Sequence, residues 1–200
     1  MTKEIVDWIR EHPWKSGNRV RYDGSCSNPN TPDAEHCSLY VGEKPRSTGR
    51  TAQIAQVDIL NEDPTVMTVD LLIELEPEHT PKKILGEVLP VLLADNYTPS
   101  RLVGAAHQRQ IKDAVFIFVT VVPDKQGSQK RSQLLRLEDT IIRKLDFHKL
   151  AVHTVKFCIG NSEADAVQQC KNTIEELLIS PPRENLHRTD ISLSNAEHTQ

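Results

Sequence analysis

Several features that would narrow the function are missing from this sequence. No apolar run approaches the roughly 18 residues that a membrane-spanning helix needs. The first residues, MTKEIVDWIREHPW, lack the apolar stretch and the small-residue cleavage site of a secretory signal. The glycine motif GxGxxG, the P-loop and the GxSxG motif of serine hydrolases are absent as well. We therefore expect a soluble, cytoplasmic protein without a membrane partner.

The cysteines give no sign of a disulfide framework. The chain has four of them: Cys26, Cys37, Cys158 and Cys170. Cys26 and Cys37 flank a polar stretch in which His36 precedes the second cysteine, but no CxxC pair supplies the further ligands of a zinc site. Ordinary reduced thiols are the simpler interpretation.

Excess positive charge is also missing. The formal net charge is −4, which does not favour nucleic-acid binding over the whole surface. Local charge matters more than the total, however, and the charges are unevenly spread. Basic residues gather in 15–21, 44–50 and 125–136, and carboxylates gather in 62–78.

The hydrophobic pattern predicts one folded domain, residues 1–179, followed by a disordered tail, residues 180–200. Hydrophobic residues make up 38% of the 200 residues, which is enough for one domain with a core. The periodicity predicts, in chain order, a helix at 3–12, a long loop at 14–37, strands at 38–43, 51–60 and 65–76, a helix from 80, a strand at 114–122, a helix at 132–146, a strand at 150–159 and a helix at 162–179. This order indicates an α/β fold with a mixed sheet.

The two central strands are predicted to form an antiparallel hairpin that turns at 61–64. In the second strand an apolar face alternates with a polar one, and the two faces are Met67, Val69, Leu71, Ile73 and Leu75 against Thr68, Asp70, Glu74 and Glu76. Asp58 alternates with apolar residues in the first strand. If the apolar faces share the core, Asp58, Glu74 and Glu76 share the opposite face. An ordinary solvated strand face shows the same alternation.

The element order and the acidic hairpin together resemble the PD-(D/E)xK, or restriction-endonuclease-like, nuclease superfamily. In that family an aspartate opens one strand, and an acidic-x-lysine tripeptide lies near the end of the next strand, before an apolar helix. The matching residues here are Val57-Asp58-Ile59 and Ile73-Glu74-Leu75-Glu76. The resemblance implies a restriction-endonuclease-like mixed β-sheet flanked by helices, in the order helix, three-strand meander, helix, strand, helix, strand, helix.

By this resemblance, Asp58 and Glu74 are ligands of Mg²⁺, with Mn²⁺ as a substitute. Carboxylate oxygens suit such a cation, which polarises a phosphate and lowers the pKa of bound water. Glu76 stands at the lysine position of the tripeptide, where it could be a further metal ligand or a base. Lys82 and Lys83 lie in the first turn of the following helix and could supply the missing cation, although two solvated lysines explain them equally well.

The resemblance therefore implies a Mg²⁺-dependent endonuclease acting on DNA, such as a restriction or host-defence enzyme, and a homodimer that cuts both strands. We expect phosphate contacts from Lys130 and Arg131 in a basic loop, and from Arg46 and Arg50 before the first motif strand. A second interpretation keeps the fold without catalysis, as a binding or assembly module with a solvated acidic hairpin. The missing lysine and the negative net charge favour that alternative.

Overall fold

The segments with apolar periodicity form α-helices and strands, and the helices pack on both faces of a mixed β-sheet. The computed structural model describes residues 1–23, 36–42, 53–77, 80–99, 107–125 and 128–179. Its elements are α1 (Thr2–Glu11), β1 (Arg19–Tyr22), β2 (Cys37–Tyr40), β3 (Gln53–Val57), β4 (Ile59–Asp63), β5 (Thr68–Glu76), α2 (Pro81–Leu93), β6 (Asn96–Tyr97), β7 (Arg109–Val121), α3 (Lys130–Lys144), the 3₁₀ turn η4 (Phe147–Lys149), β8 (Val152–Gly160) and α4 (Glu163–Ile179).

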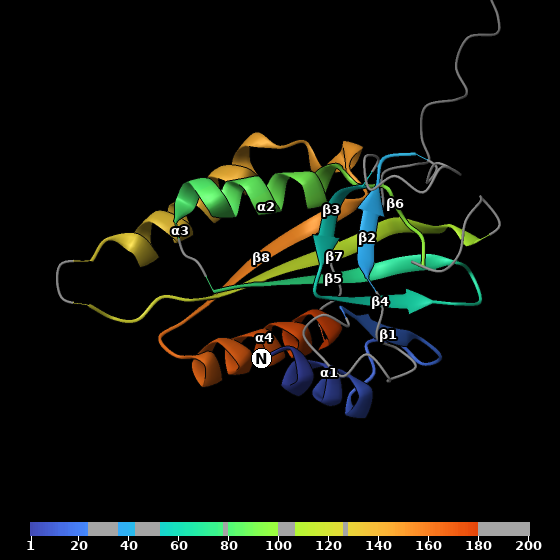
Figure 1. Ribbon diagram of the computed structural model, residues 1–200, viewed down its shortest axis with the longest axis horizontal. Coiled ribbons are helices and arrows are strands. Elements are labelled where there is room, and N and C mark those ends of the chain that lie inside the picture. Colours follow the sequence, from blue (N-terminus) through green and yellow to red (C-terminus); the bar gives the residue numbers. More distant parts are fainter. Residues whose placement is uncertain (24–35, 43–52, 78–79, 100–106, 126–127, 180–200) are drawn as a thin grey trace, which may run out of the picture.

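The sheet combines parallel and antiparallel strands. Its strand order is β1-β4-β5-β7-β6-β2-β3, and β8 pairs with β7 beside this path. The pairs β5–β7 and β7–β8 are parallel, whereas the remaining pairs are antiparallel. The sheet curls, and Figure 1 shows β2 and β3 crossing over the run of β5. The second half of the long strand β7, from Ala114 on, is covered by helices on both faces, which explains why that part of its sequence is almost entirely apolar.

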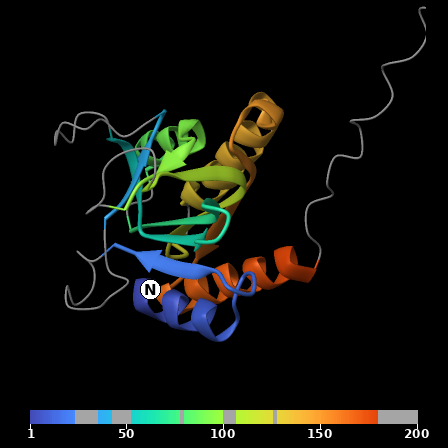
Figure 2. The same cartoon turned by 90° about the vertical axis from the view of Figure 1, so that its right-hand side faces the viewer.

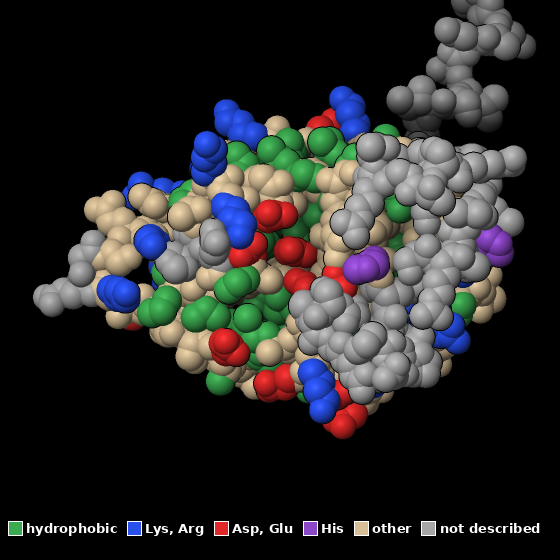
Figure 3. All heavy atoms as spheres, in the orientation of Figure 1, with side chains coloured by type: hydrophobic (Ala, Val, Ile, Leu, Met, Phe, Trp, Pro, Cys, Tyr) green, Lys and Arg blue, Asp and Glu red, His purple; other side chains and the backbone are tan. Residues whose placement is uncertain are grey.

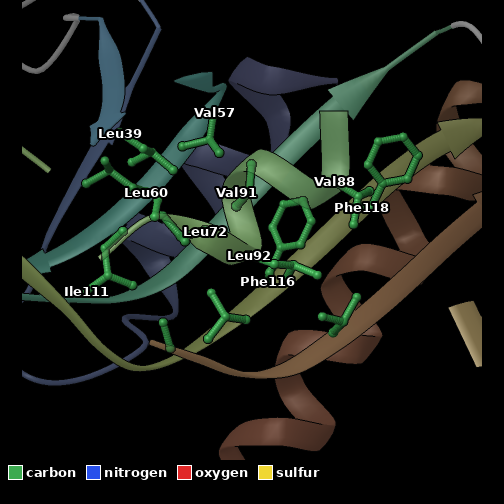
Figure 4. Packing of buried hydrophobic residues seen from close by; sticks show 14 of the residues in the cluster. Leu39, Val57, Leu60, Leu72, Val88, Val91, Leu92, Ile111, Phe116 and Phe118 are labelled. Carbon is green, nitrogen blue, oxygen red and sulfur yellow. The ribbon is translucent and has the colours of Figure 1, made fainter. Parts of the chain in front are cut away.

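Two layers of helices enclose the sheet. Figures 1 and 2 show α2 and α3 over one face, and α1 and α4 over the other. The α2–α3 core buries Val88 and Leu92 of α2 against Leu72, Phe116 and Phe118 of the sheet (Figure 4). The α1–α4 core buries alternate residues of the same strands, such as Ile73 and Ile117. Within the described residues, no helix combines the length and the apolarity needed to cross a membrane.

After the hairpin the predicted helices and strands appear in the predicted order, with the short strand β6 and the turn η4 added. Up to the end of the hairpin the described chain has five strands where a three-strand meander was predicted. Strand β1 lies inside the predicted loop 14–37. Its four residues, RVRY, alternate between polar and buried apolar side chains, but the strand is short and the stretch around it is rich in Gly, Asn, Pro and Ser, which is typical of a loop. The predicted strand 51–60 is divided at Asp58, where the chain changes partners: β3 pairs with β2, whereas β4 pairs with β1 and β5. Residues 180–200, predicted to be a disordered tail, lie outside the described part of the chain.

The hairpin turn lies at residues 64–67, not at 61–64. The side chain of Asp63 explains this position, since its Oδ1 accepts the backbone N–H groups of Thr65 and Val66 at 2.8 and 3.1 Å. An aspartate that hydrogen-bonds the backbone two and three residues ahead stabilises a turn locally. Asn61 and Glu62 therefore stay in β4 and are buried.

A β-bulge in β5 moves Asp70 away from the acidic face predicted for it. The register shifts between Asn61 and Glu62 on β4, opposite Val69 and Leu71. Because of this extra residue, Val69 faces the α2–α3 core while Leu71 faces the α1–α4 core. The prediction that both face the same way was wrong for that reason. Asp70 contacts Lys15 and residues near α1 instead of Glu74.

Candidate active site

Asp58 lies at the bend between β3 and β4 and turns its carboxylate toward the end of β5. Its Oδ2 accepts the backbone N–H of Leu75 at 2.8 Å. Its carbonyl oxygen accepts the N–H of Asp23, also at 2.8 Å, which ties the bend to the end of β1. The break between β3 and β4 at Asp58 therefore also places the Asp58 carboxylate at the end of β5.

Glu74 and Glu76 lie on the face of β5 that α2 and α3 cover. Leu72, two residues earlier, is part of the α2–α3 core. In the parallel register Glu74 lies beside Phe118, and Glu76 lies beside Thr120 on β7. Both side chains therefore project into the partly enclosed space between the sheet and α2.

The carboxyl group of Glu74 is strongly perturbed. Burial raises the pKa of Glu74 to about 9. The carboxylates of Asp58, Glu87 and Glu76 add to this rise, in that order of size. A hydrogen bond from the backbone N–H of Asp58 offsets part of it. A pKa near 9 means that Glu74 keeps its proton at neutral pH, mainly because its carboxyl group is buried and also because three other carboxylates lie nearby.

Helix α2 adds one cation and one acid to this group. The Nζ of Lys83 lies 3.2 Å from Oε2 of Glu76, whose side chain is only 10% exposed. Glu87 follows Lys83 by four residues and therefore lies on the same side of the helix. Ile84 and Val88 anchor this helix in the core. Asp58, Glu74, Glu76, Glu87 and Lys83 are called the acidic site below.

Sequence reasoning found four of these five residues and missed Glu87. The available signal was the spacing between Lys83 and Glu87, which places both on the helical face that points toward the motif strand. Lys82, the other candidate for the missing cation, lies on the exposed side of α2. The structure thus distinguishes the two lysines that the sequence left equivalent.

Two of the residues predicted to contact phosphate, Lys130 and Arg131, do not lie in a loop as expected. Lys130 and Arg131 lie in the first turn of α3 and not in a loop, because the N–H of Gln133 closes a helical turn on the carbonyl of Gln129. The guanidinium of Arg131 donates from Nη1 to Oδ1 of Asn161 at 3.0 Å. The helix follows the end of β7, so both residues lie at the same end of the parallel strands as Glu76. Arg46 and Arg50 lie outside the described residues.

The surface around the acidic site has a clear charge pattern. Figure 3 shows acidic side chains gathered in the middle of one face. Basic side chains lie beside them toward α2 and α3, and apolar side chains lie on the opposite side. A polyanion that reached the acids would thus meet positive charge along one border of the site.

A second group of polar residues adjoins the acidic site through the backbone of Asp58. The Asp23 side chain is 5% exposed, accepts a hydrogen bond from Nε2 of Gln56, and lies 3.5 Å from Nδ1 of His36. Asp23 follows β1, His36 precedes β2 and Gln56 lies in β3. The sequence predicts β2 and β3 as consecutive strands of the meander, but not the approach of Asp23 to them. The pattern of residues 14–37 carried no signal for that approach.

The acidic site suits a divalent cation in the type of its donors. Carboxylate oxygens are the ligands that Mg²⁺ and Mn²⁺ prefer. Among the described residues, however, no three His, Cys, Asp or Glu side chains stand around one point closely enough to hold a metal ion. The side chains would have to turn toward a common centre. Glu76 would also have to leave its ion pair with Lys83.

Comparison with known proteins identifies no relative. No protein-family model matches the chain, and no curated protein or solved structure matches it. Its function therefore has to be inferred from its own residues.

Proposed function

We propose that the chain is a divalent-metal-dependent endonuclease that hydrolyses phosphodiester bonds in DNA, with a restriction-endonuclease-like arrangement of its sheet and helices. The observation that supports this most is the pairing of Lys83 with Glu76 beside Asp58 and Glu74. The nuclease motif requires two acids and a cation near one another. Here the cation comes from the following helix, and a glutamate occupies the usual lysine position.

Each residue of the acidic site has a task in this proposal. Asp58 and Glu74 would hold the metal ion, and Glu76 would complete the ligands or accept a proton from water. A bound Mg²⁺ supplies charge stabilisation at the phosphate and a lower pKa for its water. Glu74 would give up its proton on binding the ion. Lys83, released from Glu76, would then carry positive charge toward the phosphate.

DNA is the proposed substrate because basic side chains border the acids. Lys130 and Arg131 lie at the start of α3, at the same end of the parallel strands as the acids. Lys130 is exposed and lines a small pocket together with Lys125 and Ser128. Exposed lysines of this kind contact phosphates without reading sequence. A homodimer that cuts both strands and a role in restriction or host defence are parts of the proposal that rest on the resemblance.

A non-catalytic binding or assembly module is the second candidate. Glu76 and Lys83 already neutralise each other, and no three acids of the described chain enclose a common point. Those two observations favour a module whose acids are solvated surface. Calorimetric titration with Mg²⁺ or Mn²⁺, with and without DNA, separates the candidates, since the module should bind neither ion.

Cleavage by two ligand variants tests the proposal. Asp58→Asn and Glu74→Gln each keep the shape of the side chain but remove a ligand charge. We expect both to lower the rate of plasmid cleavage in Mg²⁺ by about 100-fold or more while the fold stays intact. Glu175→Gln, an exposed acid on α4, is the matched control and should cleave like the wild type. Full activity in Asp58→Asn or Glu74→Gln would show that the metal site is wrongly assigned.

A further inference from the structure

A chain of polar side chains runs along the border of the acidic site and ends at an exposed histidine. Nε2 of Gln53 donates to Oε1 of Gln56 at 3.3 Å, and Nε2 of Gln56 donates to Oδ2 of Asp23. The other carboxylate oxygen of Asp23, Oδ1, lies 3.5 Å from Nδ1 of His36. The two carboxylate oxygens of Asp23 therefore have different partners, an amide and an imidazole.

The two members of this last pair are buried to very different degrees, in a way that suits proton transfer. The side chain of Asp23 is 5% exposed, whereas that of His36 is 56% exposed. An ionised carboxylate accepts hydrogen bonds and donates none, so a neutral imidazole that pairs with it through Nδ1 carries its proton there. The lone pair then lies on Nε2, on the other side of the exposed ring. An aspartate that orients a histidine in this way prepares it to act as a base.

The pair lies beside the acidic site. The backbone N–H of Asp23 donates to the carbonyl oxygen of Asp58 at 2.8 Å, and Gln56 precedes Asp58 by two residues. Figure 3 shows a histidine side chain next to the gathered acidic side chains. Strand β2, whose first residue follows His36, begins in that part of the molecule in the same orientation (Figure 1). The protein's own side chains and backbone make all of these contacts.

We infer that Asp23 and His36 form an acid–base dyad beside the acidic site, in which Asp23 is a positioning residue and His36 accepts a proton. Its part in DNA cleavage rests on the proposed function. The oxygen of the attacking water forms the new bond to phosphorus, and a proton of that water moves to Nε2 of His36. The bond to the leaving oxygen breaks, and this oxygen keeps the electron pair and takes a proton from solvent. The carboxylate of Asp23 balances the charge of the imidazolium.

The dyad also removes a conflict within the acidic site. Glu76 is bound to Lys83, with 3.2 Å between Oε2 and Nζ. A carboxylate held in an ion pair is a weaker proton acceptor, because the neighbouring cation favours its ionised form. With His36 as the base, Glu76 can keep its ion pair during the reaction.

The tautomer of His36 tests the dyad without any cleavage. Ring ¹⁵N NMR of the chain in the presence of a chelator shows which nitrogen carries the proton of the neutral imidazole. We expect Nδ1 in the wild type, and we expect Asp23→Asn to abolish this preference because an amide donates as well as accepts. His107, an exposed histidine before β7, is the internal reference and should be the same in both chains. If Asp23→Asn does not fold, the wild-type spectrum decides the point.

Cleavage kinetics test the proton transfer itself. General acid–base groups typically contribute about 100- to 10,000-fold to the rate, so we expect His36→Ala to lower kcat for plasmid cleavage in Mg²⁺ by about 100-fold, with little change in KM. Added imidazole should restore part of this loss, because a free base can enter the space that the side chain leaves. A merely structural role of His36 would not be rescued in this way. His107→Ala is the matched control and should cleave like the wild type with or without imidazole.

The outcomes separate the dyad from the proposed function. A proton on Nε2 of neutral His36 in the wild type overturns the dyad, whatever the cleavage assay shows. If the wild type cleaves DNA and His36→Ala cleaves like His107→Ala, the inference is overturned while the nuclease proposal stands, and Asp23 and His36 are a surface ion pair only. If the wild type carries the proton on Nδ1 but does not cleave DNA, the nuclease proposal is overturned, whereas the dyad is supported.

Discussion

The two ends of the β4–β5 hairpin both bury acids, but they balance the charge differently. Near the turn, Glu62 on β4 is fully buried, and its two carboxylate oxygens lie 2.9 Å from Nε of Arg21 and 3.2 Å from Nε of Arg109. At the other end, Glu74 faces the carboxylates of Asp58, Glu87 and Glu76.

Asp70 lies at the same end of the hairpin as Glu62, and its charge is also matched by neighbouring groups. This end, with Glu62 and Asp70, is called the balanced end below. Its carboxylate accepts hydrogen bonds from Nδ2 of Asn61 at 3.0 Å and Nδ2 of Asn18 at 3.2 Å. The Nζ of Lys15 lies 2.8 Å from its Oδ2. Donors from β4 and from the segment before β1 thus converge on this one buried carboxylate.

The contrast separates acids that hold the fold from acids that are available for chemistry. At the balanced end, each buried carboxylate is matched by cations and amides that come from distant parts of the chain and fix their relative positions. At the acidic site, four carboxyl groups gather near Lys83 within the described part of the chain, and one of them, Glu74, has a strongly raised pKa. Perturbed acids of this second kind concentrate at functional sites.

The largest loss of stability is expected at the balanced end. Glu62→Gln leaves two arginines, with side chains only 13% and 12% exposed, without their common carboxylate. Removing one partner of a buried ion pair leaves an uncompensated charge, so we expect the free energy of unfolding to fall by about 3 kcal/mol. Urea unfolding measures this change. DNA cleavage at temperatures where the variant is folded should remain.

An exposed ion pair provides the control for Glu62. Asp139 and Arg143 pair on the surface of α3 with side chains 55% and 68% exposed. Asp139→Asn should change the free energy of unfolding by less than about 0.5 kcal/mol, because solvent screens such pairs. Equal losses in the two variants would remove the distinction between a buried, balanced acid and a surface one.

The second prediction concerns Glu74. Replacing it with glutamine should raise the free energy of unfolding at pH 8, whereas Glu62→Gln should lower it. The folded-state pKa of Glu74, about 9, lies above the ordinary value of 4.5, so the folded metal-free chain keeps a proton that the unfolded chain releases. This contribution to stability is complete below pH 4.5 and is lost as the pH rises toward 9, at up to about 1.4 kcal/mol per pH unit. Glu74→Gln does not titrate and should be the more stable chain at pH 8, by roughly 5 kcal/mol at most over the 3.5 pH units above 4.5.

The measurement is urea unfolding of both chains at pH 5, 6.5 and 8 in the presence of a chelator. The difference between Glu74→Gln and the wild type should widen steadily across this range. Mn²⁺ should reduce the difference at pH 8 by stabilising only the wild type. A pH-independent difference would mean that Glu74 titrates normally, and the two ends of the hairpin would then be electrostatically alike.

Much of this arrangement follows from local sequence patterns. Alternation predicts that Glu74 and Glu76 share a face of their strand, and the Thr80-Pro81 start predicts α2 and with it the positions of Lys82 and Lys83. These patterns depend only on neighbouring residues. Helix α2 begins at Pro81 as expected, and it continues through Pro90 to Leu93.

The parts that could not be predicted depend on long-range pairing. The bulge that turns Asp70 away arises between β4 and β5, and no residue of β5 alone signals it. Glu62 reads as part of a turn, although Arg21 and Arg109 stabilise it in the sheet from positions 41 and 47 residues away. Predicting that Lys83, and not Lys82, faces the acids would require knowing how α2 is rotated about its axis, and its packing on the sheet determines that rotation.

A smaller effect on stability than at Glu62 or Glu74 is expected for Lys83, the cation of the acidic site. Lys83 is 39% exposed, so Lys83→Met should change the free energy of unfolding by about 1 kcal/mol or less. Methionine keeps the aliphatic part of the side chain and its packing on α2. If Lys83 serves in place of the lysine that the motif lacks, the cleavage rate in Mg²⁺ should nevertheless fall by at least about tenfold. Lys82→Met, one position earlier on the exposed side of the helix, should cleave normally. Normal cleavage by Lys83→Met would show that Lys83 does not serve in place of the motif lysine. Glu76 would then have to act with the metal and water alone.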